Sequence, residues 1–110
     1  MMYVDFNAGT KQYQLRINTR NIVALEKQLG CNPLSIFGDG SRIPTVTEMV
    51  TILHAALQQR HHGMSLNDAY SIFDDYLAEN PATDFIPVIL EIYKASGLIR
   101  MDEDEEAEKN

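Results

Sequence analysis

The longest and most clearly delimited apolar pattern in the chain lies in residues 44–63, PTVTEMVTILHAALQQRHHG. Pro44 disfavours helical dihedral angles at the residue before it, so a helix is expected to begin after it. Thr45 and Glu48 have the spacing of a capping box, in which each side chain accepts a hydrogen bond from the backbone N–H of the other residue. Gly63 is a natural residue to follow a helix end. The sequence therefore predicts a helix over most of this stretch.

The apolar residues of this helix fall on one stripe at about 100° per residue, with threonines and glutamines opposite. The stripe consists of Val46, Met49, Val50, Leu53, Ala56 and Leu57, and Ile52 widens it. A single helix of this length is only marginally stable in water, so its stripe requires other elements to cover it. We therefore expect this helix to be the scaffold on which the rest of the chain packs.

Residues 2–7 (MYVDFN) and 12–17 (QYQLRI) alternate between apolar and polar side chains, and residues 8–11 (AGTK) join them. This pattern predicts a β-hairpin. A hairpin is marginally stable by itself, so its apolar side chains should pack on the helices. Its two outer edges would carry unpaired backbone groups, which makes both edges candidate docking sites for another chain.

Two further segments before the central helix have start and stop signals. Thr19 is a plausible N-cap for a helix that reaches Leu29, with Gly30 following its end. The pair Asn32 and Pro33 then predicts a short turn of helix that extends to Phe37, since proline is favoured at the first helical position.

A third helix is predicted between Ser65, which forms a second capping box with Asp68, and the pair Asn80 and Pro81. Its predicted core stripe consists of Leu66, Ala69, Tyr70, Phe73, Tyr76 and Leu77. Together with a last helix over residues 84–96, these segments predict one mainly α domain, residues 1–100, of about four helices with an N-terminal β-hairpin over residues 2–17.

The last predicted helix is apolar around more than half of its circumference. One stripe consists of Phe85, Val88, Ile89, Ile92 and Ala95, and a second face beside it consists of Ile86, Leu90 and Tyr93. A helix this apolar is surrounded by its own domain or shared with a partner. After Gly97, Leu98 and Ile99 provide the usual hydrophobic contact of a helix end. We predict that a protein-interaction surface is formed by Ile86, Leu90, Tyr93, Leu98 and Ile99.

Length and composition describe one small acidic domain. The chain has 110 residues and a net charge of −7, and its last ten residues, MDEDEEAEKN, hold six of its acidic residues. We expect residues 101–110 to be a disordered acidic tail, and this balance argues against nucleic-acid binding. The chain has no apolar run of about 20 residues and no signal-peptide pattern, so no membrane partner is expected. The single Cys31 suits a reducing cytoplasm.

The histidines, acidic residues and cysteine of the chain do not show the spacing of a known metal or catalytic site. A zinc site at the histidines His54, His61 and His62 would need further ligands, and the chain has one thiol, Cys31. Asp74 and Asp75 lack the alternating acids and central glycine of a calcium loop. Cys31 has no evident base to activate it. We therefore predict a protein that is not an enzyme, with no catalytic residues, no metal ligands and no cofactor.

Three segments carry a family resemblance: LRINTRNIVALEKQLGCNPLSIF, PTVTEMVTILHAALQQRHHGMSLNDAYSIFDDYL and DFIPVILEIYKASGLI. Together they resemble the tail assembly chaperones of long-tailed, siphovirus-like bacteriophages and prophages of Gram-positive bacteria. The helix that ends in Leu-Gly, followed by a helix that ends in a His-Gly-like turn, also resembles the tail chaperone of gene transfer agents. The resemblance covers residues 13–100 and rests on this whole-length pattern, because no catalytic motif takes part in it.

The resemblance implies a non-enzymatic, mainly helical protein that binds the tape measure protein. Such a chaperone keeps the long apolar helices of its client soluble and assists polymerisation of the tail tube around it. The resemblance also implies a homo-oligomer in the host bacterial cytoplasm that is missing from the mature virion, with the tail tube protein as a second candidate partner.

Two other interpretations remain open. A small acidic regulatory or anti-host phage protein that mimics nucleic acid would carry acids over its folded surface, whereas here the acids concentrate in the tail. A structural head–tail connector would be found inside purified particles. The gene context and co-expression with the tape measure protein distinguish these interpretations.

Overall fold

The computed structural model describes residues 2–100, which form two strands, four α-helices and two 3-10 helices. In chain order these are β1 (Val4–Ala8), β2 (Lys11–Leu15), α1 (Thr19–Leu29), η1 (Pro33–Phe37), α2 (Val46–Leu57), α3 (Leu66–Leu77), η2 (Ala82–Asp84) and α4 (Phe85–Ala95). The predicted mainly helical fold with an N-terminal hairpin is confirmed. The predicted acidic tail, residues 101–110, lies outside the described residues. Within residues 2–100, no helix has the length and apolar character needed to cross a membrane.

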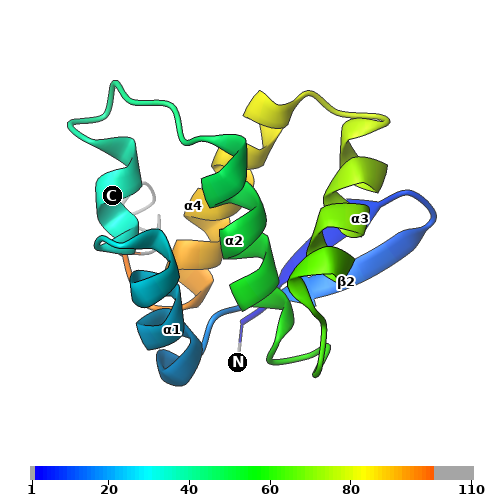
Figure 1. Cartoon of the computed structure of the whole chain (residues 1–110), viewed down its shortest axis with the longest axis horizontal. Helices are drawn as coiled ribbons and strands as arrows, with labels where there is room; N and C mark the ends of the chain where they lie inside the picture. The colour runs from blue at the N-terminus through cyan, green and yellow to red at the C-terminus, as the bar shows by residue number, and fades with distance from the viewer. Residues whose placement is uncertain (1, 101–110) are drawn as a thin grey trace, which may run out of the picture.

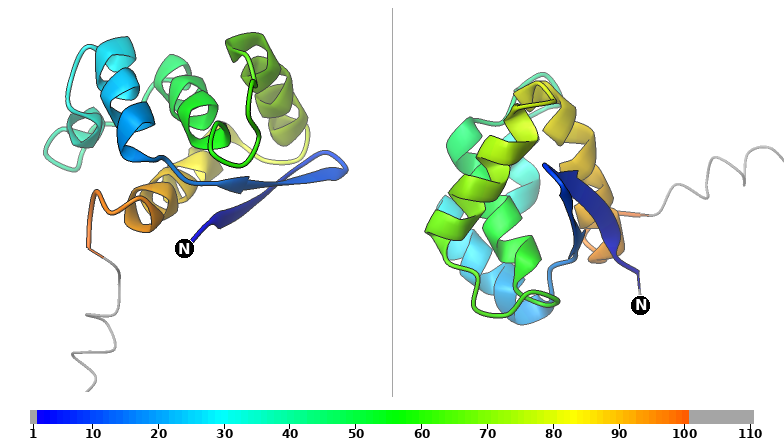
Figure 2. Two further views of the ribbon diagram at one scale, coloured as in Figure 1. Left: turned by 90° about the horizontal axis from the view of Figure 1, so that it is seen from below. Right: turned by 90° about the vertical axis from the view of Figure 1, so that its right-hand side faces the viewer.

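Helices α1, α2 and α3 lie side by side in one layer, with α2 in the middle (Figure 1). The hairpin and α4 lie together against one side of this layer (Figure 2). Helix α2 contacts α1, α3, α4 and β2. Its buried side chains are Met49, Val50, Ile52, Leu53, Ala55, Ala56 and Leu57. This helix is therefore the scaffold of the fold, as the sequence predicted.

The predicted capping box is present at the N-terminus of α2. Thr45 Oγ1 accepts a hydrogen bond from the Glu48 backbone N–H at 3.1 Å, and Glu48 Oε1 accepts one from the Thr45 N–H at 2.8 Å. Glu48 also forms an ion pair with Arg42, with 2.9 Å between Nη2 and Oε2. The prediction that Val46 is a core residue is wrong, because its position in the first turn leaves it uncovered and exposed.

Helix α2 ends at Leu57, earlier than the predicted end before Gly63. The Gln58 side chain explains this end, because its Nε2 donates to the carbonyl of His54 at 2.9 Å and to the carbonyl of Met64 at 2.8 Å. These bonds hold the following loop against the end of the helix. Gly63 supplies a positive φ of 82° within that loop rather than at the helix end.

The other helix starts agree with the sequence except at α1. The N-cap of α1 is Asn18 rather than the predicted Thr19, because Asn18 Oδ1 accepts a hydrogen bond from the Asn21 N–H at 2.9 Å. Asparagine is among the best N-cap residues, and this bond places Thr19 within the helix. The predicted cap of η1 at Asn32 and the capping box of α3 between Ser65 and Asp68 are both confirmed.

The hairpin turn is tighter than predicted. Ala8 pairs with Lys11, so the loop consists of two residues, Gly9 and Thr10, in place of the expected four. Gly9 adopts a φ of 65°, which two-residue hairpin turns require and glycine adopts without strain. The side chains that the hairpin buries against the helices are Phe6, Ala8, Tyr13 and Leu15.

Aromatic side chains join the hairpin to the helices. The Phe6 ring lies 4.9 Å from the Tyr76 ring of α3 and 5.6 Å from the Phe85 ring of α4, measured between centroids. Phe73 completes the cluster, with its ring 5.3 Å from that of Phe85 in an edge-to-face arrangement. Such pairs contribute about 0.5–1.5 kcal/mol each beyond the burial of their area, so this cluster fixes the hairpin on α3 and α4.

The outer edge of β2 is closed by the end of α2. The Arg16 N–H donates to the Ala56 carbonyl at 3.1 Å, and the Gln14 N–H donates to Nε2 of His61 at 3.2 Å. The prediction of two open hairpin edges is therefore wrong for β2. Among residues 2–100, the outer edge of β1, which carries Asp5 and Asn7, makes no backbone hydrogen bond to another element.

Lowering the pH through the titration range of His61 should destabilise the protein. Its Nε2 accepts a hydrogen bond in the folded state and is therefore unprotonated there. Burial, and then the charge of Arg60, lower the pKa of His61 from its usual value of 6.5. The imidazole of His61 therefore binds a proton more readily in the unfolded chain than in the folded one. The contribution of His61 to stability is therefore complete above about pH 6.5 and is lost as the pH falls below that value.

The urea midpoint of unfolding should accordingly be lower at about pH 5.5 than at about pH 7.5. His61→Gln, which keeps an acceptor at this position but does not titrate, should show a smaller difference between the two midpoints. His62→Gln, which changes an exposed neighbour, should behave as the wild type. A difference that persists unchanged in His61→Gln would show that another group is responsible.

Candidate functional site

The predicted interaction surface on α4 is smaller than expected. Leu90 is 37% exposed, whereas Ile86 is half-buried and packs against the core. Tyr93 is fully buried, so its predicted place on an outward face is wrong. Its hydroxyl donates to the Pro33 carbonyl at 2.9 Å, and burial raises its pKa well above the usual value. The short η1 helix covers the face of α4 that the sequence left open, as the 6.4 Å contact between the Phe37 and Tyr93 rings also shows.

Leu98 and Ile99 cover the end of α4. Gly97 follows the helix with a φ of 83°, and the Leu98 N–H donates to the Tyr93 carbonyl at 2.9 Å. Both Leu98 and Ile99 are half-buried and pack against the core. Leu90 is therefore left as the exposed member of the predicted surface.

An exposed apolar stripe on α3 was not predicted as a surface. Leu66, Tyr70 and Leu77 are 42%, 48% and 39% exposed. At about 100° per residue these three positions lie within about 40° of one another on the helix. We call them the apolar α3 stripe. The predicted core stripe of α3 was wrong at these three positions, because the face of α3 that packs on the core is formed by Ala69, Ile72, Phe73 and Tyr76.

A groove of about 240 Å³ begins at one end of the apolar α3 stripe. It is lined by Leu66 of α3, by Thr51 and His54 of α2 and by Gln28 of α1. His54 is fixed there, with its Nε2 at 3.0 Å from the Met64 carbonyl oxygen. The groove therefore runs from the apolar α3 stripe over Thr51 and His54 of α2 to α1.

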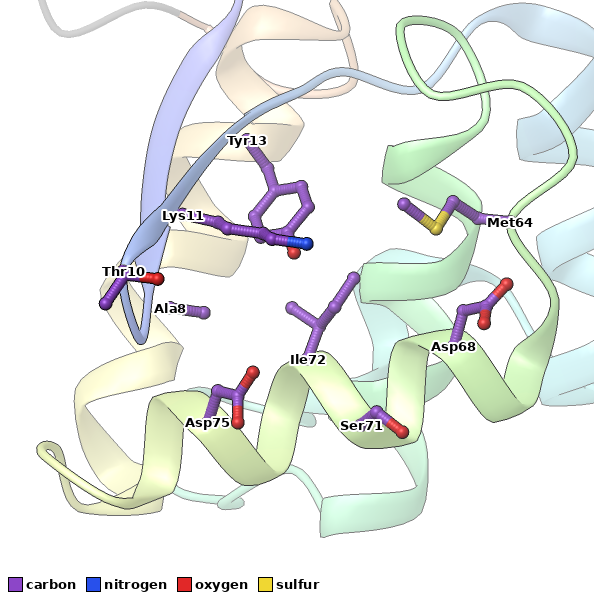
Figure 3. Close-up of a pocket in the computed structure, with 9 residues that line it drawn as sticks. All are labelled: Ala8, Thr10, Lys11, Tyr13, Met64, Asp68, Ser71, Ile72 and Asp75. Carbon is purple, nitrogen blue, oxygen red and sulfur yellow. The ribbon is translucent and has the colours of Figure 1, made fainter.

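A second hollow lies between the hairpin and α3 (Figure 3). This hairpin–α3 cleft has a volume of about 280 Å³. Its lining residues are Ala8, Thr10, Lys11, Tyr13, Met64, Asp68, Ser71, Ile72 and Asp75. No sequence pattern predicted this cleft, because its two walls come from segments that are more than fifty residues apart in the chain.

The residues weighed for metal or nucleophilic chemistry lie apart. His61 caps the edge of β2, His54 contacts the Met64 carbonyl, and Cys31 is exposed in the loop after α1. Within residues 2–100, no three His, Cys, Asp or Glu side chains are grouped so that they could hold a metal ion. The surfaces described above are therefore the candidate functional sites of the described part of the chain.

The comparisons with known proteins identify a family. No curated protein and no solved structure matches the chain. The model of a family of unknown function, DUF6096, matches residues 4–110 and so spans the hairpin and all four α-helices. The chain therefore belongs to the DUF6096 family.

Proposed function

We propose that this protein is a phage tail assembly chaperone that binds the tape measure protein and keeps it soluble while the tail tube polymerises around it. The observation that carries the proposal is the apolar α3 stripe, in which three exposed large apolar side chains share one face of a helix. A long apolar helix docks on such a surface through side chains spaced one or two turns apart. The tape measure protein is a client of this kind.

Two further observations support this proposal. The resemblance to tail assembly chaperones covers residues 13–100 and includes the segment that forms the apolar α3 stripe. The groove at Leu66 continues from the apolar α3 stripe towards α1, so a client could contact more than one helix. We propose that the apolar α3 stripe and the groove bind the client without catalysing a reaction.

In this proposal the chain also associates with itself. Leu90 and the half-buried Ile86 lie one turn apart on α4, and the outer edge of β1 offers backbone groups for pairing. Helix α4 and β1 belong to the layer that packs against the layer of α3 (Figure 2). A homo-oligomer built through them leaves the stripe free for the client.

Leu90→Asp should leave a folded monomer. The side chain is 37% exposed, so a carboxylate there reaches water in the monomer but would be buried without a partner in an interface. Size-exclusion chromatography with light scattering should therefore give the mass of one chain, with an unchanged circular dichroism spectrum. Thr83→Asp adds the same charge at an exposed position before α4 and should keep the wild-type mass. An unchanged oligomer in Leu90→Asp would exclude this face as the interface.

A chaperone and a head–tail connector differ in whether the protein is present in finished particles. We expect the protein in the host bacterial cytoplasm, bound to the tape measure protein before assembly and missing from finished particles. A tagged chain is recovered from induced cells and from purified particles. Quantitative mass spectrometry then measures how much tape measure protein is bound to it in the cells and how much of the chain the particles contain. A long, helix-rich reading frame directly downstream of its gene should encode the client. Stoichiometric recovery of the chain in purified particles would favour a head–tail connector instead.

A further inference from the structure

The hairpin–α3 cleft has two walls of different charge. On the hairpin side, β2 contributes Lys11 and the hydroxyl of Tyr13 (Figure 3). On the other side, α3 contributes Asp68 and Asp75, which are two helical turns apart, with Ile72 between them. A ligand that fits this cleft therefore needs a cationic group for one wall, an acceptor for the other and an apolar part between them.

Three polar side chains of the cleft, those of Lys11, Tyr13 and Asp75, have no hydrogen-bond or ion-pair partner among residues 2–100. Tyr13 is only 8% exposed, its hydroxyl points into the cleft, and it forms no hydrogen bond with another residue in the range 2–100. Lys11 and Asp75 form no ion pair within the same range. Asp68, by contrast, is already engaged, because its Oδ2 accepts the Ser65 N–H at 2.9 Å in the capping box of α3.

The walls are held in place before any ligand arrives. The Tyr13 ring packs edge-to-face on His61 with 5.3 Å between centroids, and the capping box of α3 fixes Asp68. The hairpin turn approaches α3 so closely that a Cβ built on Gly9 would lie 3.5 Å from the Cβ of Asp75. A preformed cleft with convergent polar groups loses little entropy on binding.

We propose that the hairpin–α3 cleft binds a lysine or arginine residue of a partner polypeptide. The cationic group pairs with the carboxylate of Asp75, the aliphatic stem lies on Ile72, and the charge of Asp68 acts from two helical turns away. The backbone carbonyl of the bound residue accepts hydrogen bonds from Tyr13 Oη and Lys11 Nζ. This arrangement gives a partner to each of the side chains of Lys11, Tyr13 and Asp75, which have none among residues 2–100.

The charge states of the cleft residues at neutral pH fit this partner. Hydrogen bonds from the Ser65 backbone and hydroxyl lower the pKa of Asp68, so its carboxylate is charged. Burial, and then the charge of Asp75, raise the pKa of Tyr13, so its hydroxyl keeps the proton that it donates. The proposal goes beyond the assignment as a tail chaperone, because it concerns another face of α3 and a basic residue rather than an apolar helix.

A blocked tripeptide, acetyl-Ala-Lys-Ala-amide, tests this proposal by NMR titration of the full chain. The backbone amide signals of Gly9, Ser71 and Ile72 should shift in a saturable way. The norleucine analogue, which keeps the stem and lacks the charge, should bind about tenfold more weakly. n-Butylamine has the cation without a backbone carbonyl and should also bind more weakly than the lysine peptide. Equal binding of norleucine peptide would overturn the proposal, and equal binding of butylamine would show that the cleft takes free amines instead.

Three variants assign the effect to the cleft. Asp75→Asn should weaken binding of the lysine peptide about tenfold, and Tyr13→Phe about fivefold, because they remove a charged and a neutral hydrogen bond respectively. Asp74→Asn makes the same charge change on the neighbouring exposed residue and should leave the affinity unchanged. If Asp74→Asn weakened binding as much as Asp75→Asn, the peptide would be responding to the overall charge of the helix. Wild-type affinity in Asp75→Asn would also overturn the proposal.

The peptide titration is independent of the proposed chaperone function. The variant Leu66→Asp/Tyr70→Asp, which changes the apolar α3 stripe, should bind the lysine peptide with wild-type affinity because neither residue lines the cleft. Loss of client binding in that variant and loss of peptide binding in Asp75→Asn are therefore separate results, and each proposal can fail alone.

Discussion

Leu53→Asp should give a chain that does not fold. Leu53 lies in the middle of α2 and is completely buried. Among residues 2–100 no buried side chain is charged, so a carboxylate at this position would have no ionic partner. A buried unpaired charge costs several kcal/mol, added to about 2–5 kcal/mol for the lost apolar contacts, against a total stability of about 5–15 kcal/mol. Circular dichroism should show little helix and no cooperative thermal transition.

Thr47→Asp is the matched control for this variant. It places the same charge on the same helix, at an exposed position in the first turn, where the helix dipole favours an acid. It should unfold cooperatively at or slightly above the wild-type temperature. Leu53→Ala should fold but lose about 3 kcal/mol of stability, which shows whether burial of the side chain or the added charge dominates. A cooperative Leu53→Asp variant of near wild-type stability would contradict the role of α2 as scaffold.

The double variant Leu66→Asp/Tyr70→Asp should lose binding to the tape measure protein while it stays folded. Both side chains are nearly half exposed, so two carboxylates can be solvated in the free domain. In a docked complex they would lie against an apolar helix. Central apolar residues of an interface typically contribute about 2 kcal/mol or more each, so the affinity should fall by at least about a hundredfold. Calorimetric titration with a purified helical segment of the tape measure protein measures this loss.

The variant Asn67→Asp controls for added charge in the same turn. Asn67 is exposed and lies off the apolar α3 stripe, so its acid should leave the client affinity within about twofold of wild type. Retained binding in the double variant would show that the client uses another surface. Equal losses in the double variant and in Asn67→Asp would indicate electrostatic repulsion of the client rather than loss of an apolar contact.

The elements of this fold could be predicted because their signals are local. The capping boxes at Thr45 and Ser65 and the alternation in the hairpin depend on neighbours within a few residues. The errors in their bounds are also local in origin. Asn18 competes with Thr19 for the same cap, and the side chain of Gln58 ends α2 by a bond to the Met64 carbonyl, which no periodicity describes.

The surfaces could not be predicted in the same way, because helix periodicity identifies apolar residues and not what covers them. Tyr93 and Tyr70 both lie on apolar faces in the sequence. Tyr93 is buried, and η1 supplies a carbonyl for its hydroxyl. Tyr70 is exposed because it lies off the face of α3 that packs on the core, to which Ile72 belongs. The cleft between Tyr13 and Asp75 depends on where the hairpin crosses α3. A contact of this kind is set by packing of the aromatic cluster rather than by a sequence motif.

The solubility of the tape measure protein tests the proposed function most directly. The tape measure protein is expressed in bacteria alone, with the wild-type chain, or with Leu66→Asp/Tyr70→Asp, and its soluble fraction is measured after centrifugation. We predict that it is mostly insoluble when expressed alone, mostly soluble with the wild-type chain and insoluble again with the double variant. An equally insoluble tape measure protein in the presence of the folded wild-type chain would contradict the proposed chaperone function.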